Sequence, residues 1–326
     1  MRSGILKMNI TILEEYKMAK ASPAEIKELM KATGVGMMEC KKALEESDGD
    51  KEKAITLLRE KGLATQAKKS GRAAAEGIVT AVVDGNVGVI LEVNTETDFA
   101  ANTDDIKNFV AAVAKTIVET APADVEDLKT KTISGGSSTV GEVLTELAGM
   151  KIRENIVIRR FERREGVLAS YIHNGGSIGV LVKMDTDLSA DKVAEVGKNV
   201  AMQSAAMNAS YLNKEAVPAS VLENEKSIIM AQMAEDPKMA SKPEQVRAKI
   251  AEGKVGKYYS ENCLLEQTFV RSDLFDGTVA KYVADAAKKL GGSIEVVECI
   301  RYERGEGVEK KADNFAEEVA AMAKGN

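Results

Sequence analysis

The chain has 326 residues, a formal net charge of −6, and 44% apolar and 29% charged residues. This length predicts two or more compact units, because a single core rarely grows past about 250 residues. The acidic balance argues against direct nucleic-acid binding, which usually needs a basic face, and no apolar run approaches the ~20 residues of a membrane helix.

Side chains that usually carry catalysis or bind metals are scarce. The chain has one histidine, His173, and three widely separated cysteines, so neither zinc-ligand spacing nor a redox pair is found. A nucleophilic Cys40 would need His173 from a distant part of the chain as its base. No glycine-rich run has the form of a phosphate-binding loop. We therefore expect a cytoplasmic protein without catalytic residues, metal, cofactor or membrane partner.

The first residues predict an extension followed by a helical unit. Residues 1–17 precede Met18, a second possible start, and are expected to have no role in the fold. Residues 18–68 predict a three-helix bundle, whose first helix begins with the capping box Ser22-Pro23-Ala24-Glu25. The third helix is expected at Lys51–Lys61 and to end at Gly62.

The bundle resembles a ubiquitin-associated domain. Its contact surface is expected where the first and second helices meet, at the loop Thr33–Gly36 and the following Met37 and Met38. Methionine suits both cores and adaptable interfaces, so we expect one of the two methionines to be buried and the other exposed. The basic run that follows, at residues 64–72, is expected to be a solvated helical tail.

The middle of the chain contains an internal duplication. The segment Glu76–Val79 is echoed at residues 165–168, and Arg160–Val167 is echoed at Arg301–Val308. In each copy two β-rich runs flank a turn, as in a hairpin, and an Ala- and Val-rich helix follows. The patterns predict an α+β fold with two small antiparallel sheets, each covered by helices on one face. The first subdomain is expected at 69–166, and the second at 167–212 together with 259–308.

The two copies differ where the inner strand of each hairpin ends. The first copy has two more residues between this strand and the Thr-Asp pair, and it has Phe99 where the second has Leu188. An aromatic residue between a strand and a helix can belong to the core, or it can be a wedge for a partner. The longer exit, with Asp98-Phe99 at its tip, favours a projecting contact loop.

Two further helical segments are expected in the second half. Residues 213–258 interrupt the second copy with two helical stretches, which predict an inserted helical hairpin. This hairpin needs a partner or the body of the protein to bury its apolar face. Residues 309–326 predict a short C-terminal amphipathic helix. Its apolar face consists of Phe315, Val319 and Met322.

Several interpretations compete. His173 lies at a hairpin tip, where it is either a solvent-facing turn residue or a polar contact to a partner. The three-helix unit suggests a ubiquitin-binding adaptor, which leaves the duplicated core unexplained. The basic pairs Lys68-Lys69 and Arg159-Arg160 suggest an RNA-associated accessory, against which the overall acidity weighs. Cys40 with His173 would suggest an enzyme.

Two segments resemble the signatures of the translation elongation factor Ts family. They are Thr33–Leu44 (TGVGMMECKKAL) and Glu92–Phe99 (EVNTETDF). The duplicated core, the inserted hairpin and the terminal helix follow in the family's order. The resemblance implies a guanine-nucleotide exchange factor that binds elongation factor Tu, a translational GTPase, and promotes GDP release without covalent chemistry.

The resemblance also implies roles for individual residues. The turn Thr97-Asp98-Phe99-Ala100 enters beside the partner's magnesium and phosphate site, where Phe99 can displace the elements that hold GDP. Stabilising the nucleotide-free partner weakens nucleotide binding by the same coupling free energy. Residues 213–258 are associated with dimerisation in some members, so a homodimer is one expectation. The other partner contacts are expected at Val35, Gly36, Met37, Met38, His173, Phe315, Val319 and Met322.

Two positions depart from the family's pattern. Met30 stands where Arg is frequent, which removes any charged contact from that position. Ala100 replaces the usual Val after the aromatic residue, which trims the apolar base of the wedge. Asp98 and Phe99 are both kept, so nucleotide exchange remains the predicted function.

Overall fold

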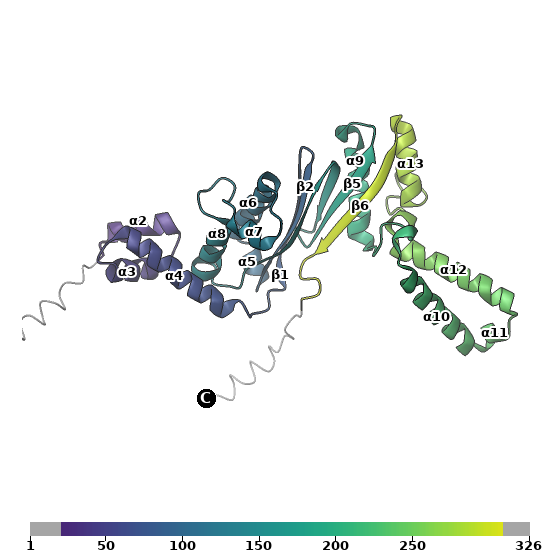
Figure 1. The fold of residues 1–326 in the computed structure, drawn as a ribbon, viewed down its shortest axis with the longest axis horizontal. Coiled ribbons are helices and arrows are strands. Elements are labelled where there is room, and N and C mark those ends of the chain that lie inside the picture. Colours follow the sequence, from purple (N-terminus) through teal and green to yellow (C-terminus); the bar gives the residue numbers. More distant parts are fainter. Residues whose placement is uncertain (1–20, 309–326) are drawn as a thin grey trace, which may run out of the picture.

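The structure is a computed structural model that describes residues 21–308 (Figure 1). The predicted α+β class is confirmed: N-terminal helices precede two three-stranded antiparallel sheets and further helices. The bundle lies at one end of the long axis, and the inserted helices lie toward the other. The predictions for residues 1–17 and for Phe315, Val319 and Met322 fall outside the described residues.

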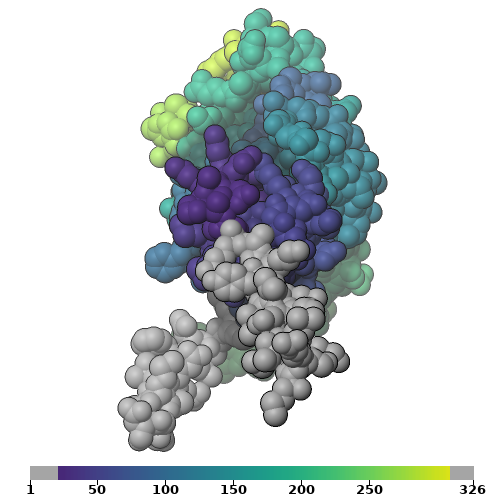
Figure 2. All heavy atoms as spheres, turned by 90° about the vertical axis from the view of Figure 1, so that its left-hand side faces the viewer, coloured from purple at the N-terminus to yellow at the C-terminus, as the bar shows by residue number. Residues whose placement is uncertain are grey.

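Three helices form the N-terminal bundle, which lies in front of the first core subdomain in Figure 2. The predicted capping box is present: the Ser22 hydroxyl accepts a hydrogen bond from the Glu25 amide at 3.2 Å, and the Glu25 carboxylate accepts one from the Ser22 amide at 2.8 Å. Leu29, Leu44 and Leu58 belong to the apolar cluster that fills the bundle. The helices are α2 (Pro23–Thr33), α3 (Met37–Glu46) and α4 (Lys51–Lys69).

The predicted end of the third helix at Gly62 is wrong, because α4 continues to Lys69. Gly62 is buried inside the helix, where α4 packs on the following unit. A Cβ atom built at Gly149 would lie 2.3 Å from the Gly62 carbonyl oxygen, so the two backbones touch where both residues lack a side chain. The glycine therefore permits a close approach of two elements, and it does not cap the helix.

Two antiparallel sheets form the core, and their topology repeats. In each sheet a hairpin supplies the first two strands, as predicted, and the third strand pairs with the second after intervening helices. The first sheet consists of β1 (Glu76–Asp84), β2 (Val87–Thr95) and β3 (Val157–Glu165). The second consists of β4 (Val167–His173), β5 (Ile178–Thr186) and β6 (Ile294–Glu303).

Helices cover one face of each sheet (Figure 1). On the first sheet the long helix α6 carries buried residues along one face, including Ile106, Val110 and Val113. The chain between β2 and β3 forms α5 (Asp98–Ala101), α6 (Asp104–Thr120), α7 (Val125–Thr130), α8 (Val140–Glu146) and the π-helix η1 (Leu147–Lys151). The second sheet is covered by α9 (Ala190–Met207) and α13 (Val279–Leu290).

The inserted helical hairpin is also present. Its two long helices pack on each other through a small apolar cluster that includes Ile229, Met233 and Val255. Short 3-10 turns flank it, η2 (Lys214–Ala216) before and η3 (Leu264–Glu266) after. The hairpin consists of α10 (Ala219–Glu235), α11 (Pro237–Ala240) and α12 (Glu244–Asn262).

The faces that helices leave free pack sheet against sheet. Gly88 and Gly179 occupy matching positions in the two hairpins. A Cβ atom built at Gly88 would lie 2.8 Å from Leu181 Cδ1, and one built at Gly179 would lie 2.6 Å from Val79 Cγ1. Each sheet therefore accepts the other's side chains at an equivalent glycine. The cluster between the sheets consists of Val79, Ala81, Ile90, Leu168, Leu181 and Tyr302.

Candidate functional site

The turn after β2 has a buried base and an exposed tip. Thr97 is the N-cap of the short helix α5, and its hydroxyl oxygen accepts a hydrogen bond from the Ala100 amide at 3.2 Å. Ala100 and Ala101 are buried, whereas Asp98 is exposed. Phe99 is 83% exposed, more than any other large apolar side chain of residues 21–308. The sequence therefore places an apolar ring in solvent at the end of a buried strand.

Hydrogen bonds from several directions hold this turn. Both carboxylate oxygens of Glu154 accept hydrogen bonds from Thr97, one from the amide at 3.0 Å and one from the hydroxyl at 2.7 Å. The Thr95 hydroxyl donates to the Thr97 carbonyl at 2.7 Å. The Asn102 side-chain amide donates to the Asp98 carbonyl at 2.9 Å. These bonds satisfy the backbone of the turn, so its tip is presented in one arrangement.

The sister turn in the second copy buries its tip. The Thr186 hydroxyl accepts a hydrogen bond from the Leu188 amide at 3.1 Å, and Leu188 packs against the second apolar core. The Asp187 carboxylate accepts a hydrogen bond from the Ser293 amide at 2.7 Å. In contrast, the Asp98 carboxylate has no hydrogen-bond or ion-pair partner among residues 21–308. The first turn is thus the one whose acid and apolar side chain remain free.

The second predicted contact surface lies at the start of α3. Met37 and Met38 are 60% and 59% exposed, so the prediction that one of them is buried is wrong. The residue of this loop that packs into the bundle is Val35, which is 2% exposed. The Cys40 thiol donates a hydrogen bond to the Val35 carbonyl oxygen at 3.4 Å. Burial raises the pKa of Cys40. The exposed surface of the loop therefore consists of Gly36, Met37 and Met38, with Val35 supporting it from inside.

His173 ends β4 and is exposed, next to the tight turn of the second hairpin. Its Nδ1 atom lies 3.2 Å from the Tyr171 hydroxyl oxygen, and the centroids of the two rings are 6.0 Å apart. The ring therefore faces solvent beside one aromatic neighbour. Its role as a partner contact stays a prediction.

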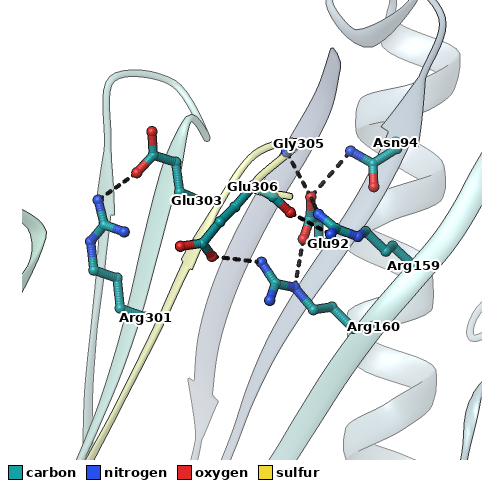
Figure 3. A network of polar contacts seen from close by, with 8 residues as sticks. All are labelled: Glu92, Asn94, Arg159, Arg160, Arg301, Glu303, Gly305 and Glu306. Carbon is teal, nitrogen blue, oxygen red and sulfur yellow. Dashed lines mark hydrogen bonds and ion pairs between the residues drawn. The ribbon is translucent and has the colours of Figure 1, made fainter. Parts of the chain in front are cut away.

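A buried carboxylate, Glu92, joins the first sheet to the end of β6 (Figure 3). Glu92 is 0% exposed and lies in β2. It accepts hydrogen bonds from Arg159 Nη1 at 2.9 Å, Arg160 Nε at 2.7 Å, Asn94 Nδ2 at 3.1 Å and the Gly305 amide at 2.8 Å. Both arginines reach it because β3 has a bulge there: Glu92 pairs with Arg160, and the next residue of β2 pairs with the residue before Arg159.

Burial and hydrogen bonding act in opposite directions on Glu92. Burial raises the pKa of its carboxyl group, whereas hydrogen bonds from the Gly305 amide, Arg159, Arg160 and Asn94 lower it, and together they bring the pKa below its ordinary value. Arg160 also contacts Glu306 at 3.2 Å and lies over the Tyr302 ring at 4.0 Å. The ionised carboxylate therefore fixes residues 303–306 against the first sheet.

Sequence reasoning missed the residues that support these surfaces. Glu92 could have been found from the sequence, because an acidic residue inside the apolar run Val87–Val93 requires a cationic or hydrogen-bonding partner. Glu154 and Asn155 carry no such signal, because their partners are about 57 to 59 residues away along the chain. Only the folded chain brings them to the Thr97 turn.

Among residues 21–308, no three His, Cys, Asp or Glu side chains are grouped so that they could hold a metal ion. No helix in this part is long and apolar enough to cross a membrane. Phe99, Met37 and Met38 have the three most exposed large apolar side chains of residues 21–308.

Comparison with known proteins identifies the family. The family described as "Elongation factor TS" matches residues 96–306. Elongation factor Ts of Clostridium kluyveri is 48% identical over 306 residues, which cover 92% of this chain and 98% of that protein. The proteins of the same name from Syntrophotalea carbinolica (44% over 309 residues, 94% and 100%) and Clostridium perfringens (46% over 302 residues, 91% and 97%) are similar along almost their whole length. The chain therefore belongs to the elongation factor Ts family, the non-catalytic nucleotide exchange factors that act on elongation factor Tu in translation elongation.

Proposed function

We propose that the turn Thr97–Ala100 is the part of the chain that acts on the magnesium and phosphate site of elongation factor Tu. The observation that carries this proposal is Phe99, a ring 83% exposed on a turn whose backbone is held by hydrogen bonds. A preorganised anchor loses little conformational freedom when it binds. Burying the ring against the nucleotide-free partner stabilises that state and weakens GDP binding by the same amount.

Asp98 complements the ring with a negative charge. Its side chain is exposed and extends from the same turn as Phe99. Beside a site that holds Mg²⁺ and phosphate groups, a carboxylate can compete for the cation or for the donors that bind the phosphates. Both effects weaken GDP binding without making or breaking a covalent bond.

The remaining contacts would set affinity. Gly36, Met37 and Met38 offer an exposed, adaptable surface for the GTPase domain, with Val35 shaping the loop from beneath. His173 would contribute a polar contact from the second subdomain. The C-terminal residues Phe315, Val319 and Met322 would add an apolar contact that embraces the partner.

We propose that each of the predicted units has its own role in binding or exchange. Residues 18–68 bind the GTPase domain, residues 69–166 carry the exchange turn, and residues 167–212 with 259–308 hold the second surface. Residues 213–258 would carry a homodimer contact, which the exposed side chains Ile228, Met230 and Val246 of the helical hairpin favour. Sedimentation of the wild type and of an Ile228→Lys, Met230→Lys variant tests this; an unchanged sedimentation coefficient contradicts the dimer.

The exchange proposal is tested by the release of fluorescently labelled GDP from elongation factor Tu. We expect strong acceleration by the wild type. Burying a Phe side chain is worth about 2 kcal/mol, and most of the Phe99 ring is free to be buried. Phe99→Ala should therefore lower the acceleration about 30-fold, and Asp98→Ala with Phe99→Ala should lower it further.

A matched control removes another exposed apolar side chain. Leu274→Ala, in the loop before α13, should leave the release rate unchanged. Wild-type release by the Asp98→Ala, Phe99→Ala variant would contradict the proposed mechanism. No acceleration by the wild type would contradict exchange activity itself.

A further inference from the structure

The chain between η1 and β3 contacts both proposed binding surfaces. We propose that Glu154 is a positioning residue for Phe99, and that the segment Arg153–Asn155 holds the Phe99 turn in a fixed relation to the methionine surface. This inference rests on the proposed function of Phe99. It assigns Glu154 no contact with the partner, because both of its carboxylate oxygens are engaged by Thr97.

The first step is the hydroxyl group of Thr97, which has two roles. It donates its hydrogen to Glu154 Oε1 at 2.7 Å and accepts a hydrogen bond from the Ala100 amide at 3.2 Å. A hydroxyl group has one hydrogen and two lone pairs, so donating to Glu154 orients a lone pair toward Ala100. The carboxylate thereby fixes the N-cap of α5, and Asp98 and Phe99 are the next two residues.

The second step is the length of α5. It has four residues, Asp98–Ala101, which is far below the length at which a helix is stable by itself. Its geometry therefore depends on contacts from outside. Its N-cap is bound to Glu154, and the preceding residue, Glu96, accepts a hydrogen bond from the Asn155 amide at 2.6 Å. Two consecutive residues, Glu154 and Asn155, thus hold the base of the turn.

The third step is the connection to the bundle. The Arg153 guanidinium donates to Glu39 in α3, and the Lys69 ammonium at the end of α4 donates to the Arg153 carbonyl. The Asn155 side-chain amide donates to the Arg72 carbonyl at 2.7 Å. Arg153 has φ +60, a left-handed conformation that non-glycine residues adopt only when surrounding contacts hold it.

These contacts place the two surfaces at the ends of one short, constrained segment. Glu39 is in the first turn of α3, which begins with Met37 and Met38. Glu154 is the neighbour of Arg153 and holds the turn that presents Phe99. A partner that binds the methionine surface therefore meets the ring in a defined position. In enzymes, misplacing a reacting group by about 1 Å can cost 10²-fold in rate, and we expect a misplaced ring to act less well in the same sense.

The test separates the maximal rate of GDP release from the concentration of factor that gives half of it. Glu154→Ala should lower the maximal rate about tenfold, with little change in the half-saturating concentration, because the methionine surface still binds. Glu154→Gln, which has the same shape and should fold, should lower it about threefold, because an NH₂ group would replace one of the two acceptor oxygens and would face a Thr97 donor. Glu126→Ala, on the exposed face of α7, is the matched control and should not change the rate.

The same substitutions in the Phe99→Ala protein decide between positioning and general stabilisation. If Glu154 acts through Phe99, Glu154→Ala should have no further effect there. A further tenfold loss in the Phe99→Ala background, or a wild-type maximal rate for Glu154→Gln, would overturn the positioning role. Wild-type release by Phe99→Ala alone would instead refute the proposed function of the ring. The two failures are thus distinguishable.

Discussion

Replacing Glu92 by Gln tests how firmly the two halves of the core are joined. The carboxylate is fully buried and accepts four hydrogen bonds, two of them from arginines. A Gln side chain can still accept bonds at the oxygen that faces the Gly305 amide. Its NH₂ group, however, would face Arg160 Nε, which is also a donor. The substitution therefore removes the ion pairs and places two donors against each other.

The expected loss follows from the burial of the partners. Breaking a buried ion pair costs about 3–5 kcal/mol, because a charge remains without its partner. Here the side chains of Arg159 and Arg160 are 26% and 32% exposed, and Arg160 keeps Glu306, so both can be partly rehydrated. We therefore expect a loss at the lower end, about 3 kcal/mol. In a chain of this size this corresponds to a fall of about 6–12 °C in the midpoint of the core's thermal transition.

The assay is thermal and urea unfolding of the wild type and of Glu92→Gln as a function of pH. Because the pKa of Glu92 is lowered on folding from its ordinary value of 4.5, its contribution is present above that value and is lost as the pH falls through the folded pKa. The two proteins should differ most near neutral pH and converge in acid. Glu165→Gln is the control: this carboxylate is exposed on β3 and pairs with Arg163 alone, so its removal should cost less than about 1 kcal/mol.

Either of two results would refute this reasoning. One is a free energy of unfolding for Glu92→Gln within about 0.5 kcal/mol of the wild type at pH 7. The other is a difference that stays constant down to the acid transition, because the stabilisation would then not come from the ionised carboxylate.

Three further predictions follow from exposure and close contact. Phe99→Ala should leave the thermal midpoint measured by circular dichroism unchanged, because the ring is 83% exposed and contributes little to the fold. Gly149→Ala should destabilise the protein by about 1–3 kcal/mol in calorimetry, because the new methyl group would lie 2.3 Å from the Gly62 carbonyl; an unchanged calorimetric transition would contradict the close packing of α4. Met37→Ala with Met38→Ala should weaken binding to elongation factor Tu by about 1–2 kcal/mol in titration calorimetry without changing the thermal midpoint.

Local patterns predicted the elements of this fold well, because each has a cause in neighbouring residues. The capping box at Ser22 and the turn at Asp84-Gly85-Asn86 act over three or four residues. Helix α13 is absent from the predictions, although its buried positions Val279, Tyr282 and Val283 follow the spacing of a helical face. Such features specify secondary structure before any tertiary contact forms.

The predictions that were wrong depend on contacts between distant parts of the chain. A glycine late in a helical pattern usually marks a C-cap, but Gly62 is matched to Gly149 in a distant segment. Two adjacent methionines look alike in sequence, and only the packing of Val35 into the bundle leaves both outside. The candidate site divides in the same way. The pair Asp98-Phe99 stood out by comparison of the two copies, whereas Glu154, which supports it, could not be found without the fold.

The matching glycines of the two sheets, Gly88 and Gly179, give the contact between them the character of a symmetric dimer interface built within one chain. In an association of two identical chains, both copies must carry the same side chain at every position. An exposed ring useful on one copy would then be repeated on the other, where it would be an unpaired apolar surface. Covalent linkage removes this constraint: one copy can turn Leu188 inward for its own core, while the other leaves Phe99 free for another molecule.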